Sequence, residues 1–237
     1  VVNGEMPELL RTDKDFFHME RQSGQKTAED IVDLYCHRLP KAYGYDAVHD
    51  IEVLCPSKKG DTGTVNLNRL LQEAVNPSAK GKGEWKLPSH VFREGDKVMQ
   101  IKNDYNLLWT KGKEEGSGIF NGDIGRLTKI DRTHGRIEID FDGRIAIYPP
   151  ENLKNLELAY AVTVHKSQGS EFEAVIMPVI EIPPQLRYRN LFYTAVTRAR
   201  RMMITIGREP EIAAMVENDK KVRRFSALSH FLEDTEQ

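Results

Sequence analysis

The chain has 237 residues, of which 39% are hydrophobic and 30% charged, and its formal net charge at pH 7 is -2. This length suffices for one large core and a small second module, and the balanced charge excludes a nucleic-acid interface built on bulk positive charge, which leaves only local patches. The two cysteines, Cys36 and Cys55, lack zinc-ligand spacing and no apolar run is long enough to span a membrane, which argues against a structural zinc and against a membrane protein and predicts a cytoplasmic location.

The first part of the chain alternates strand and helix patterns. Residues Asp15–Met19 predict a short strand, and a loop is expected over Glu20–Lys26. Thr27 and Asp30 have the spacing of a capping box, which predicts the start of a helix there. The helical pattern that follows is expected to end at Pro40.

A second strand and helix follow. The apolar run Ile51–Cys55 predicts a buried strand, and Thr64 is the expected N-cap of a helix that ends at Asn76 and Pro77. Because strands that alternate with helices favour a parallel sheet, the predicted fold class is α/β.

After Pro77 the pattern changes from helical spacing to short strands separated by turns. The strands we expect are Lys97–Ile101, Gly125–Asp131, Gly135–Phe141 and Arg144–Tyr148. They predict a small antiparallel β-barrel at residues 86–153, inserted into an α/β domain formed by residues 1–85 and 154–237. The chain is expected to return to the parent sheet from Leu156 onward.

A long arm, Asn103–Asn121, lies between the first two barrel strands and carries Tyr105 and Trp109 among lysines. Exposed aromatic rings beside lysines could stack on bases while the lysines meet phosphates. The alternative is that these rings fill a barrel with little core of its own.

The segment Leu158–Met177 combines a β-branched run through Val164, a polar turn over His165–Glu171 and a second apolar run. This pattern predicts strand, loop, strand. Polar loops at the carboxyl ends of buried strands hold ligands in open α/β sheets, so the turn is a candidate binding site.

The segment Asn190–Gly207 has helical spacing through Ala199, followed by a strand at Met202–Ile206. On this helix Arg198 is expected to face away from the apolar side and toward an anionic partner. The alternative is that Arg198 complements the helix carboxyl end and stays solvated. A short helix is expected from Pro210, and then a basic run, Lys220–Arg224, and a terminal helix, Phe225–Leu232.

Two stretches carry a family resemblance. AYAVTVHKSQGSEFEAV, residues 159–175, resembles motif V of superfamily 1 helicases, and LFYTAVTRAR, residues 191–200, resembles motif VI. The group most similar is RecD-like, which includes the α subunit of exodeoxyribonuclease V and its stand-alone relatives. REGDKVMQIKNDYN and FNGDIGRL further resemble the Src-homology-3-like barrel of that group. The resemblance implies a RecA-like motor domain, the second of two, with this barrel inserted.

For activity, the resemblance implies an ATP-dependent helicase that moves 5′ to 3′ on single-stranded DNA in repair and recombination. Arg198 takes the place of an arginine finger, which stabilises charge on the γ-phosphate of ATP. Thr163 and His165 take the places of contacts to the DNA backbone. Glu171 takes the place of a contact to the nucleotide sugar.

Gln168 and Gly169 lie in the turn between the DNA and nucleotide residues and are assigned to the nucleotide side. The loop Pro56–Thr64 stands where the family has motif IV, so Lys58 or Lys59 is a candidate nucleotide contact. The alternative for these two lysines is a solvated turn.

The sequence shows no G-x-x-x-x-G-K-S/T motif, the loop that cradles phosphates and helps to hold Mg²⁺. We therefore expect the chain to be the carboxyl-terminal part of a larger protein, with the Mg²⁺ ligands in an amino-terminal motor domain and no metal site here. Expected partners are ATP, single-stranded DNA, that motor domain and other exodeoxyribonuclease V subunits. Alone, the chain is expected to be inactive as an ATPase. The alternative function is a non-catalytic module that binds single-stranded DNA or protein.

Overall fold

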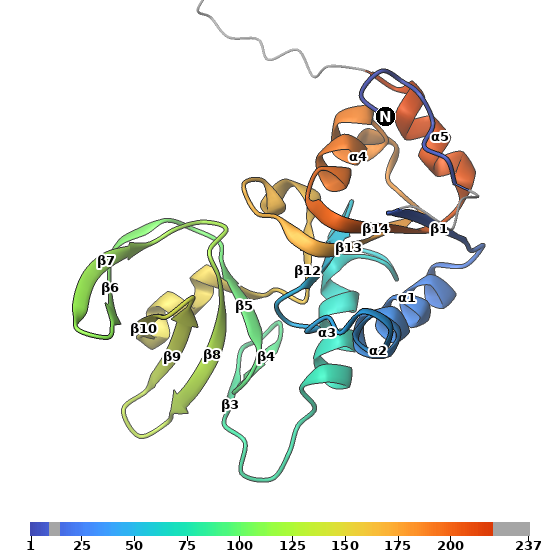
Figure 1. Ribbon diagram of the computed structural model, residues 1–237. Coiled ribbons are helices and arrows are strands. Elements are labelled where there is room, and N and C mark those ends of the chain that lie inside the picture. The colour runs from blue at the N-terminus through green and yellow to red at the C-terminus, as the bar shows by residue number, and fades with distance from the viewer. Residues whose placement is uncertain (10–14, 220–237) are drawn as a thin grey trace, which may run out of the picture.

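A computed structural model describes residues 1–9 and 15–219 of the chain. Two lobes lie side by side, one built on a parallel sheet with helices on both faces and the other on an antiparallel barrel (Figure 1). The basic run and terminal helix expected after residue 219 lie outside the described residues.

The parallel sheet has the strand order β1-β14-β13-β2-β12. Its strands are β1 Phe16–Glu20, β2 Ile51–Cys55, β12 Ala161–Thr163, β13 Phe172–Val179 and β14 Ala199–Gly207. Every pairing among them is parallel. The strand predicted at Ile51–Cys55 is confirmed, and all its residues are buried. This agrees with the rule that parallel sheets are covered on both faces.

Helices cover both faces of this sheet. They are α1 Gly24–Asp33, α2 Leu39–Tyr43, α3 Thr64–Val75, α4 Arg189–Val196 and α5 Glu209–Glu217. Because strand side chains alternate between faces, Val53 packs in the cluster that contains residues of α1 and α3, whereas its neighbour Leu54 packs with residues of α4 and α5.

Three of the predicted helix boundaries need correction. The first helix begins at Gly24, within the expected loop, because the Ser23 side chain caps it by accepting from the Lys26 backbone N–H. The Thr27 hydroxyl instead donates to the Ser23 carbonyl at 2.9 Å, so Thr27 does not cap the helix. The helical path also continues past Pro40, through a π-helical turn at Leu34–Arg38, to Tyr43.

The third correction concerns the helix after β2, whose N-cap is Gly63 rather than Thr64. The backbone N–H groups of Thr64 and Val65 donate to the carbonyls of Ser57 and Lys58. The preceding loop thus folds back and satisfies amides of the first turn, which a capping side chain would otherwise do.

The barrel sheet has the order β11-β5-β8-β9-β10-β6-β7 with antiparallel pairings, and β3 and β4 form a separate hairpin. The bounds are β3 Glu84–Lys86, β4 Val91–Arg93, β5 Lys97–Gln100, β6 Asp104–Lys111, β7 Glu114–Ile119, β8 Ile124–Asp131, β9 Arg136–Phe141, β10 Arg144–Tyr148 and β11 Leu156–Leu158. The four predicted strands are confirmed within one residue at each end.

Two expectations about the barrel are wrong. The expected arm Asn103–Asn121 is a β-hairpin, because β6 and β7 pair with each other, with an irregular register between Asp104 and Leu108. Leu156–Leu158 pairs with β5 and belongs to the barrel sheet, so the chain rejoins the parallel sheet only at Ala161. Short 3-10 helices, Pro150–Asn155, Val164–Ser167 and Pro184–Leu186, complete the described structure.

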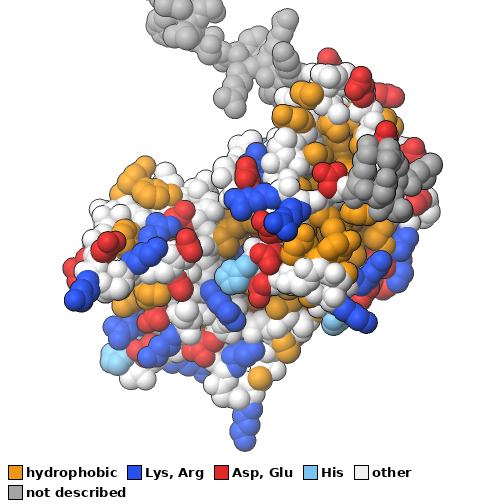
Figure 2. Space-filling model, in the orientation of Figure 1, with side chains coloured by type: hydrophobic (Ala, Val, Ile, Leu, Met, Phe, Trp, Pro, Cys, Tyr) orange, Lys and Arg blue, Asp and Glu red, His pale blue; other side chains and the backbone are white. Residues whose placement is uncertain are grey.

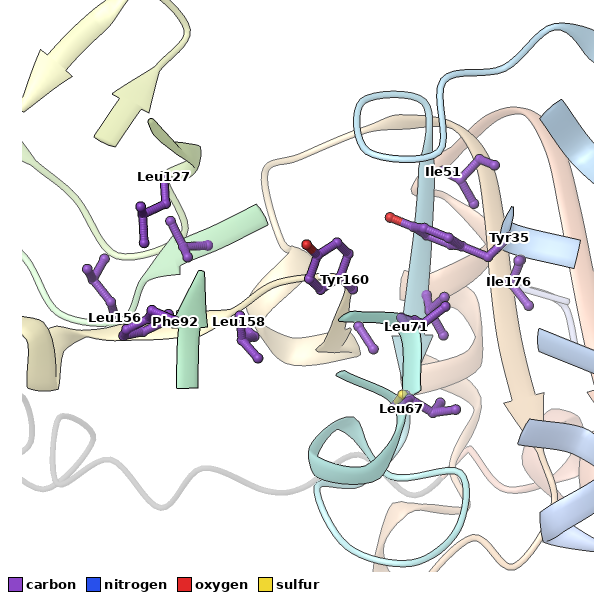
Figure 3. Packing of buried hydrophobic residues seen from close by; sticks show 14 of the residues in the cluster. Tyr35, Ile51, Leu67, Leu71, Phe92, Leu127, Leu156, Leu158, Tyr160 and Ile176 are labelled. Atoms are coloured by element: carbon purple, nitrogen blue, oxygen red, sulfur yellow. The ribbon is translucent and has the colours of Figure 1, made fainter. Parts of the chain in front are cut away.

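One continuous core joins the lobes. Figure 3 shows Phe92, Leu127 and Leu156 on the barrel side, and the cluster continues through Leu158 and Tyr160 toward the parallel sheet. The barrel is therefore packed against the sheet through an apolar seam and is not joined to it by linkers alone.

Buried polar groups fix the same seam. The fully buried Asp96 carboxylate accepts hydrogen bonds from Gln72 and Asn76 of α3 and the flanking cap, at 2.6 and 2.7 Å, and from the Tyr160 hydroxyl at 2.9 Å. Next to it in sequence, Lys97 donates to Glu52 of β2 at 2.9 Å. Barrel residues thus reach into the parallel-sheet lobe at two adjacent positions.

Replacing Lys97 with Met should lower the free energy of unfolding by about 3–5 kcal/mol at high pH, because one charge of a buried pair loses its partner. Burial raises the pKa of Glu52 to about 7, although Lys97 favours the charged form. The folded state therefore binds this proton more readily than the unfolded chain, and stability from Glu52 decreases as the pH rises from about 4.5 to 7.

Without Lys97, burial of the ionised Glu52 carboxylate costs more free energy. The loss of stability in Lys97→Met should therefore be larger at pH 8, where Glu52 is ionised, than at pH 5. Denaturant unfolding at the two pH values measures it. Lys86→Met, at an exposed position of β3, is the matched control. An equal loss at both pH values would contradict the assignment.

Candidate functional site

The polar loop after β12 connects opposite edges of the parallel sheet. Thr163 ends β12 beside Cys55, the last residue of β2, so it lies at the carboxyl edge. Phe172 begins β13 beside Ala199, the first residue of β14, so it lies at the amino edge. Because all these strands are parallel, the loop between Thr163 and Phe172 must cross from one edge to the other. The sequence predicted the loop but not this crossing.

Arg198 lies at the amino edge. Helix α4 ends at Val196, so Arg198 is in the turn before β14 and not on the helix, which corrects the helical placement. The reason is that Ala199 joins the β13–β14 ladder, and the Phe172 N–H donates to the Arg198 carbonyl at 2.9 Å. Strand pairing therefore overrides the helical spacing of the sequence.

The Arg198 guanidinium holds the end of the crossing loop. Its Nη1 donates to the Ser170 carbonyl at 2.9 Å and its Nη2 contacts the Thr197 hydroxyl at 3.3 Å. Its Nε is buried and has no hydrogen-bond partner among the described residues. Two of the five guanidinium N–H groups are thus occupied, which leaves capacity for an anion.

Glu171 lies at the same edge and forms an ion pair with Arg200 at 3.1 Å. Arg201 pairs with Glu173 at 3.0 Å. Both arginines near Arg198 are therefore neutralised by carboxylates, and Arg198 is the cation there without a carboxylate partner among the described residues.

Gln168 and Gly169 lie in the exposed part of the crossing loop. Gly169 has φ +93° and no atom near the position of a Cβ, so backbone conformation and not space requires glycine there. Among the described residues, the side-chain hydrogen bonds of Arg198 go to Ser170 and Thr197 and not to Gln168 or Gly169.

Thr163 and His165 lie at the start of the loop, near the carboxyl edge. Thr163 is half-buried, and the exposed His165 has its Nε2 2.9 Å from the Tyr188 hydroxyl. Lys58 and Lys59 also follow β2 at the carboxyl edge. The structure therefore places these two lysines at the carboxyl edge of the sheet, together with Thr163. It separates them from Arg198 and Glu171, which were also expected to contact the ATP nucleotide.

Lys58 shares a carboxylate with a residue that the sequence analysis missed. Glu157 of β11 accepts from Lys58 at 3.2 Å and from Lys166 at 2.7 Å. Lys166 stands inside the motif V stretch, which was the available signal. Nothing in the sequence indicated that Glu157 would face it. Figure 2 shows basic side chains gathered where the lobes meet, with acidic side chains among them.

The two barrel aromatics have different surroundings. Tyr105 is 66% exposed, and its ring lies edge-on to Phe120, with 5.6 Å between the ring centroids. Trp109 is half-buried, its ring packs on Gly116, and its Nε1 is buried without a partner among the described residues. Tyr105 is thus mostly exposed, whereas Trp109 is partly a packing residue.

Within residues 1–9 and 15–219, no three His, Cys, Asp or Glu side chains come together in a way that could hold a metal ion. The same residues include no helix that is long and apolar enough to cross a membrane.

Comparisons with known proteins agree with this architecture. Residues 67–141 match the family of the ATP-dependent RecD-like DNA helicase SH3 domain, and residues 158–204 match the UvrD-like helicase C-terminal domain. The ATP-dependent RecD2 DNA helicase of Deinococcus radiodurans is 39% identical over 157 residues, which cover 66% of this chain and 20% of that protein. The RecBCD enzyme subunit RecD of Mycolicibacterium smegmatis is 29% identical over 166 residues, covering 70% and 26%.

The chain therefore spans about a fifth to a quarter of the length of these two relatives. Among solved structures, the Pif1 helicase from Bacteroides in complex with ADP-AlF3 and ssDNA is 19% identical, with a TM-score of 0.49 over 88% of this chain and 50% of that chain. The sequence motifs, the barrel match and the helicase domain match lead to one assignment: the chain belongs to the RecD-like group of superfamily 1 helicases and carries the SH3-like barrel and the C-terminal helicase domain of that group.

Proposed function

We propose that this chain is the second motor domain of an ATP-dependent DNA helicase that moves 5′ to 3′ on single-stranded DNA and unwinds duplex in repair and recombination. The observation that carries the proposal is the crossing loop. One end of it holds Thr163 at the carboxyl edge, and the other end is fixed by the hydrogen bond from Arg198 to Ser170 at the amino edge. A residue on the nucleotide side and a residue on the DNA side thus belong to one connected segment.

On the nucleotide side, ATP is proposed to bind against the amino edge, between this domain and a first motor domain of the same protein. The buried, unpartnered Nε of Arg198 fits an anionic ligand. To reach a γ-phosphate, Arg198 exchanges its bond to Ser170. Glu171 binds the sugar after releasing Arg200, and Gln168 and Gly169 let the loop adjust between these states. Hydrolysis of ATP supplies the free energy, and Mg²⁺ is held by residues of the first motor domain.

On the DNA side, Thr163 and His165 are proposed to contact backbone phosphates. Hydroxyl and imidazole groups are neutral donors, which suits a contact that has to be released in each cycle. Tyr105 stacks on a base, and Trp109 stabilises the same hairpin by packing its ring on Gly116. The proposed partners beyond DNA are the first motor domain and, in a RecBCD-like assembly, its other subunits.

The isolated chain should show no DNA-stimulated ATP hydrolysis, because it lacks the glycine-rich loop with Lys and Ser/Thr that cradles phosphates. Phosphate release with and without single-stranded DNA measures this. DNA-stimulated turnover that disappears in Arg198→Ala would show that the chain has a complete nucleotide site and would contradict the two-domain arrangement. DNA binding without any turnover in the protein with both motor domains would favour a non-catalytic binding module.

In a protein that carries both motor domains, Arg198→Lys should reduce hydrolysis by roughly 10³-fold or more and leave ATP affinity nearly unchanged, because lysine keeps the charge but loses the planar fork. Steady-state rates and nucleotide binding separate the two effects. Arg38→Lys, at an exposed position of the π-helical turn, is the control. If affinity and turnover decrease together, Arg198 is a general binding residue.

Tyr105→Ala should weaken single-stranded DNA binding by about 1–3 kcal/mol, the usual value of one stacked base, with almost no change in melting temperature. Trp109→Ala should lower the melting temperature as well, because its ring packs on Gly116. Tyr43→Ala, which truncates another exposed tyrosine, controls for loss of surface aromatic area. Unchanged DNA affinity in folded Tyr105→Ala would remove the hairpin from the DNA path.

A further inference from the structure

We propose that the cavity between α3 and the barrel holds one nucleotide of the DNA strand, with its phosphate against Lys58 and Lys166 and its base inside the cavity. The proposal rests on the proposed DNA-binding function. It assigns a DNA phosphate to Lys58 and Lys166, whereas the position of Lys58 in the sequence suggested a contact to ATP.

The cavity has a volume of about 460 Å³ and lies between α3, the turn that joins β3 to β4, and β11. This volume is within the range of about 300–1,000 Å³ that is usual for small-ligand sites. Val65, Val91 and Leu158 contribute apolar walls, and Lys58 and Glu157 stand at one side. Arg69, Glu73 and Arg93 line other parts of the wall. Apolar walls next to the Lys58 ammonium group suit a base joined to a phosphate.

The charged side of the cavity adjoins the proposed DNA contact Thr163. A small void of about 10 Å³ is lined by Lys58, Thr163, Lys166 and Glu157 together. Since two ammonium groups share the one Glu157 carboxylate, one of their two positive charges is not neutralised by it. A backbone phosphate can satisfy it. The first-turn amides of α3 do not compete for that phosphate, because the carbonyls of Ser57 and Lys58 already bind two of them.

Most polar groups in the cavity wall already have partners. Asn68 exchanges hydrogen bonds with the backbone of Ala161, and Gln72 donates to Asp96. Arg93 pairs with Glu73 at 2.6 Å. These groups shape the wall and are not available to a ligand.

His90 also lines the cavity and keeps hydrogen-bonding capacity. Its Nδ1 lies 2.9 Å from the Ser89 hydroxyl, and its Nε2 is buried without a partner among the described residues. Burial lowers the pKa of His90, although Glu157 opposes this effect, so the ring is neutral near pH 7. The free ring nitrogen then offers one hydrogen bond to the edge of a base, as donor or acceptor according to the tautomer.

The phosphate half of the proposal is tested with an oligo-dT probe and this chain at graded salt. Glu157→Gln should tighten binding several-fold, because it releases both lysines. The double variant Lys58→Ala, Lys166→Ala should weaken binding and reduce the salt slope by about 0.7, the value of one phosphate on a single strand. Lys41→Ala, at an exposed position of α2, should change neither. A merely structural role for Glu157 predicts weaker binding in Glu157→Gln, which would overturn the proposal.

The base half is tested with an abasic oligomer of the same length. The chain should prefer oligo-dT by about tenfold, equivalent to about 1.4 kcal/mol. Val65→Trp places a large ring over the cavity from a position that is 68% exposed, so folding is retained. In a Tyr105→Ala background, where stacking on Tyr105 no longer contributes, this variant should lose the preference and keep the salt slope, whereas Ala74→Trp in the same background, at another exposed position of α3, should keep both.

Two failures are distinguishable. If the chain binds no single-stranded DNA at any salt, the proposed function fails and the cavity assignment fails with it. If it binds and Thr163→Ala weakens binding, but Glu157→Gln and Val65→Trp change nothing, only the cavity assignment is overturned.

Discussion

The placement of the barrel depends on a buried polar seam. Asp96 is fully buried in the turn just before β5 and accepts four hydrogen bonds, including one from the backbone N–H of Arg93. A buried carboxylate is tolerated only when its oxygens are satisfied. The donors come from α3 and its C-cap, from the residue preceding β12 and from the β3–β4 hairpin, and they can meet only in one relative arrangement of these elements. Burial of apolar side chains in the seam holds the two lobes together but does not fix their orientation. The directional hydrogen bonds of Asp96 fix that orientation.

This orientation determines what the edges of the sheet can do. Glu157 belongs to the barrel sheet through its pairing with Met99, whereas Lys58 and Lys166 come from loops of the parallel-sheet lobe. Their ion pairs therefore form only because the seam holds β11 against the carboxyl edge. The wall of the adjacent cavity has the same origin, since one side is α3 and the other is barrel. Any ligand held there would be sensitive to the position of the barrel.

The sequence was most informative where local patterns decide the structure. The buried run Ile51–Cys55 and the barrel strands follow from apolar patterning and turns, and their positions agree with the structure within a residue. The motif stretches indicated the family before the fold was known. The glycine at position 169 was placed in a turn, and its positive φ explains the residue type.

The errors have a common physical cause, which is that partners distant in sequence decide the outcome. Leu156–Leu158 reads as a strand of either sheet, and only its pairing with β5 settles which. Ala199 fits helical spacing, but pairing with Phe172 ends the helix before it. In the sequence, Tyr105 and Trp109 are both aromatic residues among lysines, and nothing separates them. In the structure Tyr105 is exposed and Trp109 is half-buried, and the β6–β7 hairpin that carries them has an irregular register between Asp104 and Leu108.

The crossing loop shows how such long-range contacts could couple two ligands. The bond from Arg198 to Ser170 joins a cation to a carbonyl, and charge-assisted hydrogen bonds are stronger than neutral ones. An anion that recruits Arg198 must therefore compete with the loop for the guanidinium, and only the difference between the two contacts is available to shift the loop. Because the same loop begins at Thr163, a change at Ser170 can be transmitted along a short segment that starts with a 3-10 turn at Val164–Ser167. By reciprocity, a ligand that orders the Thr163 end would change the affinity for the anion at Arg198 by the same factor.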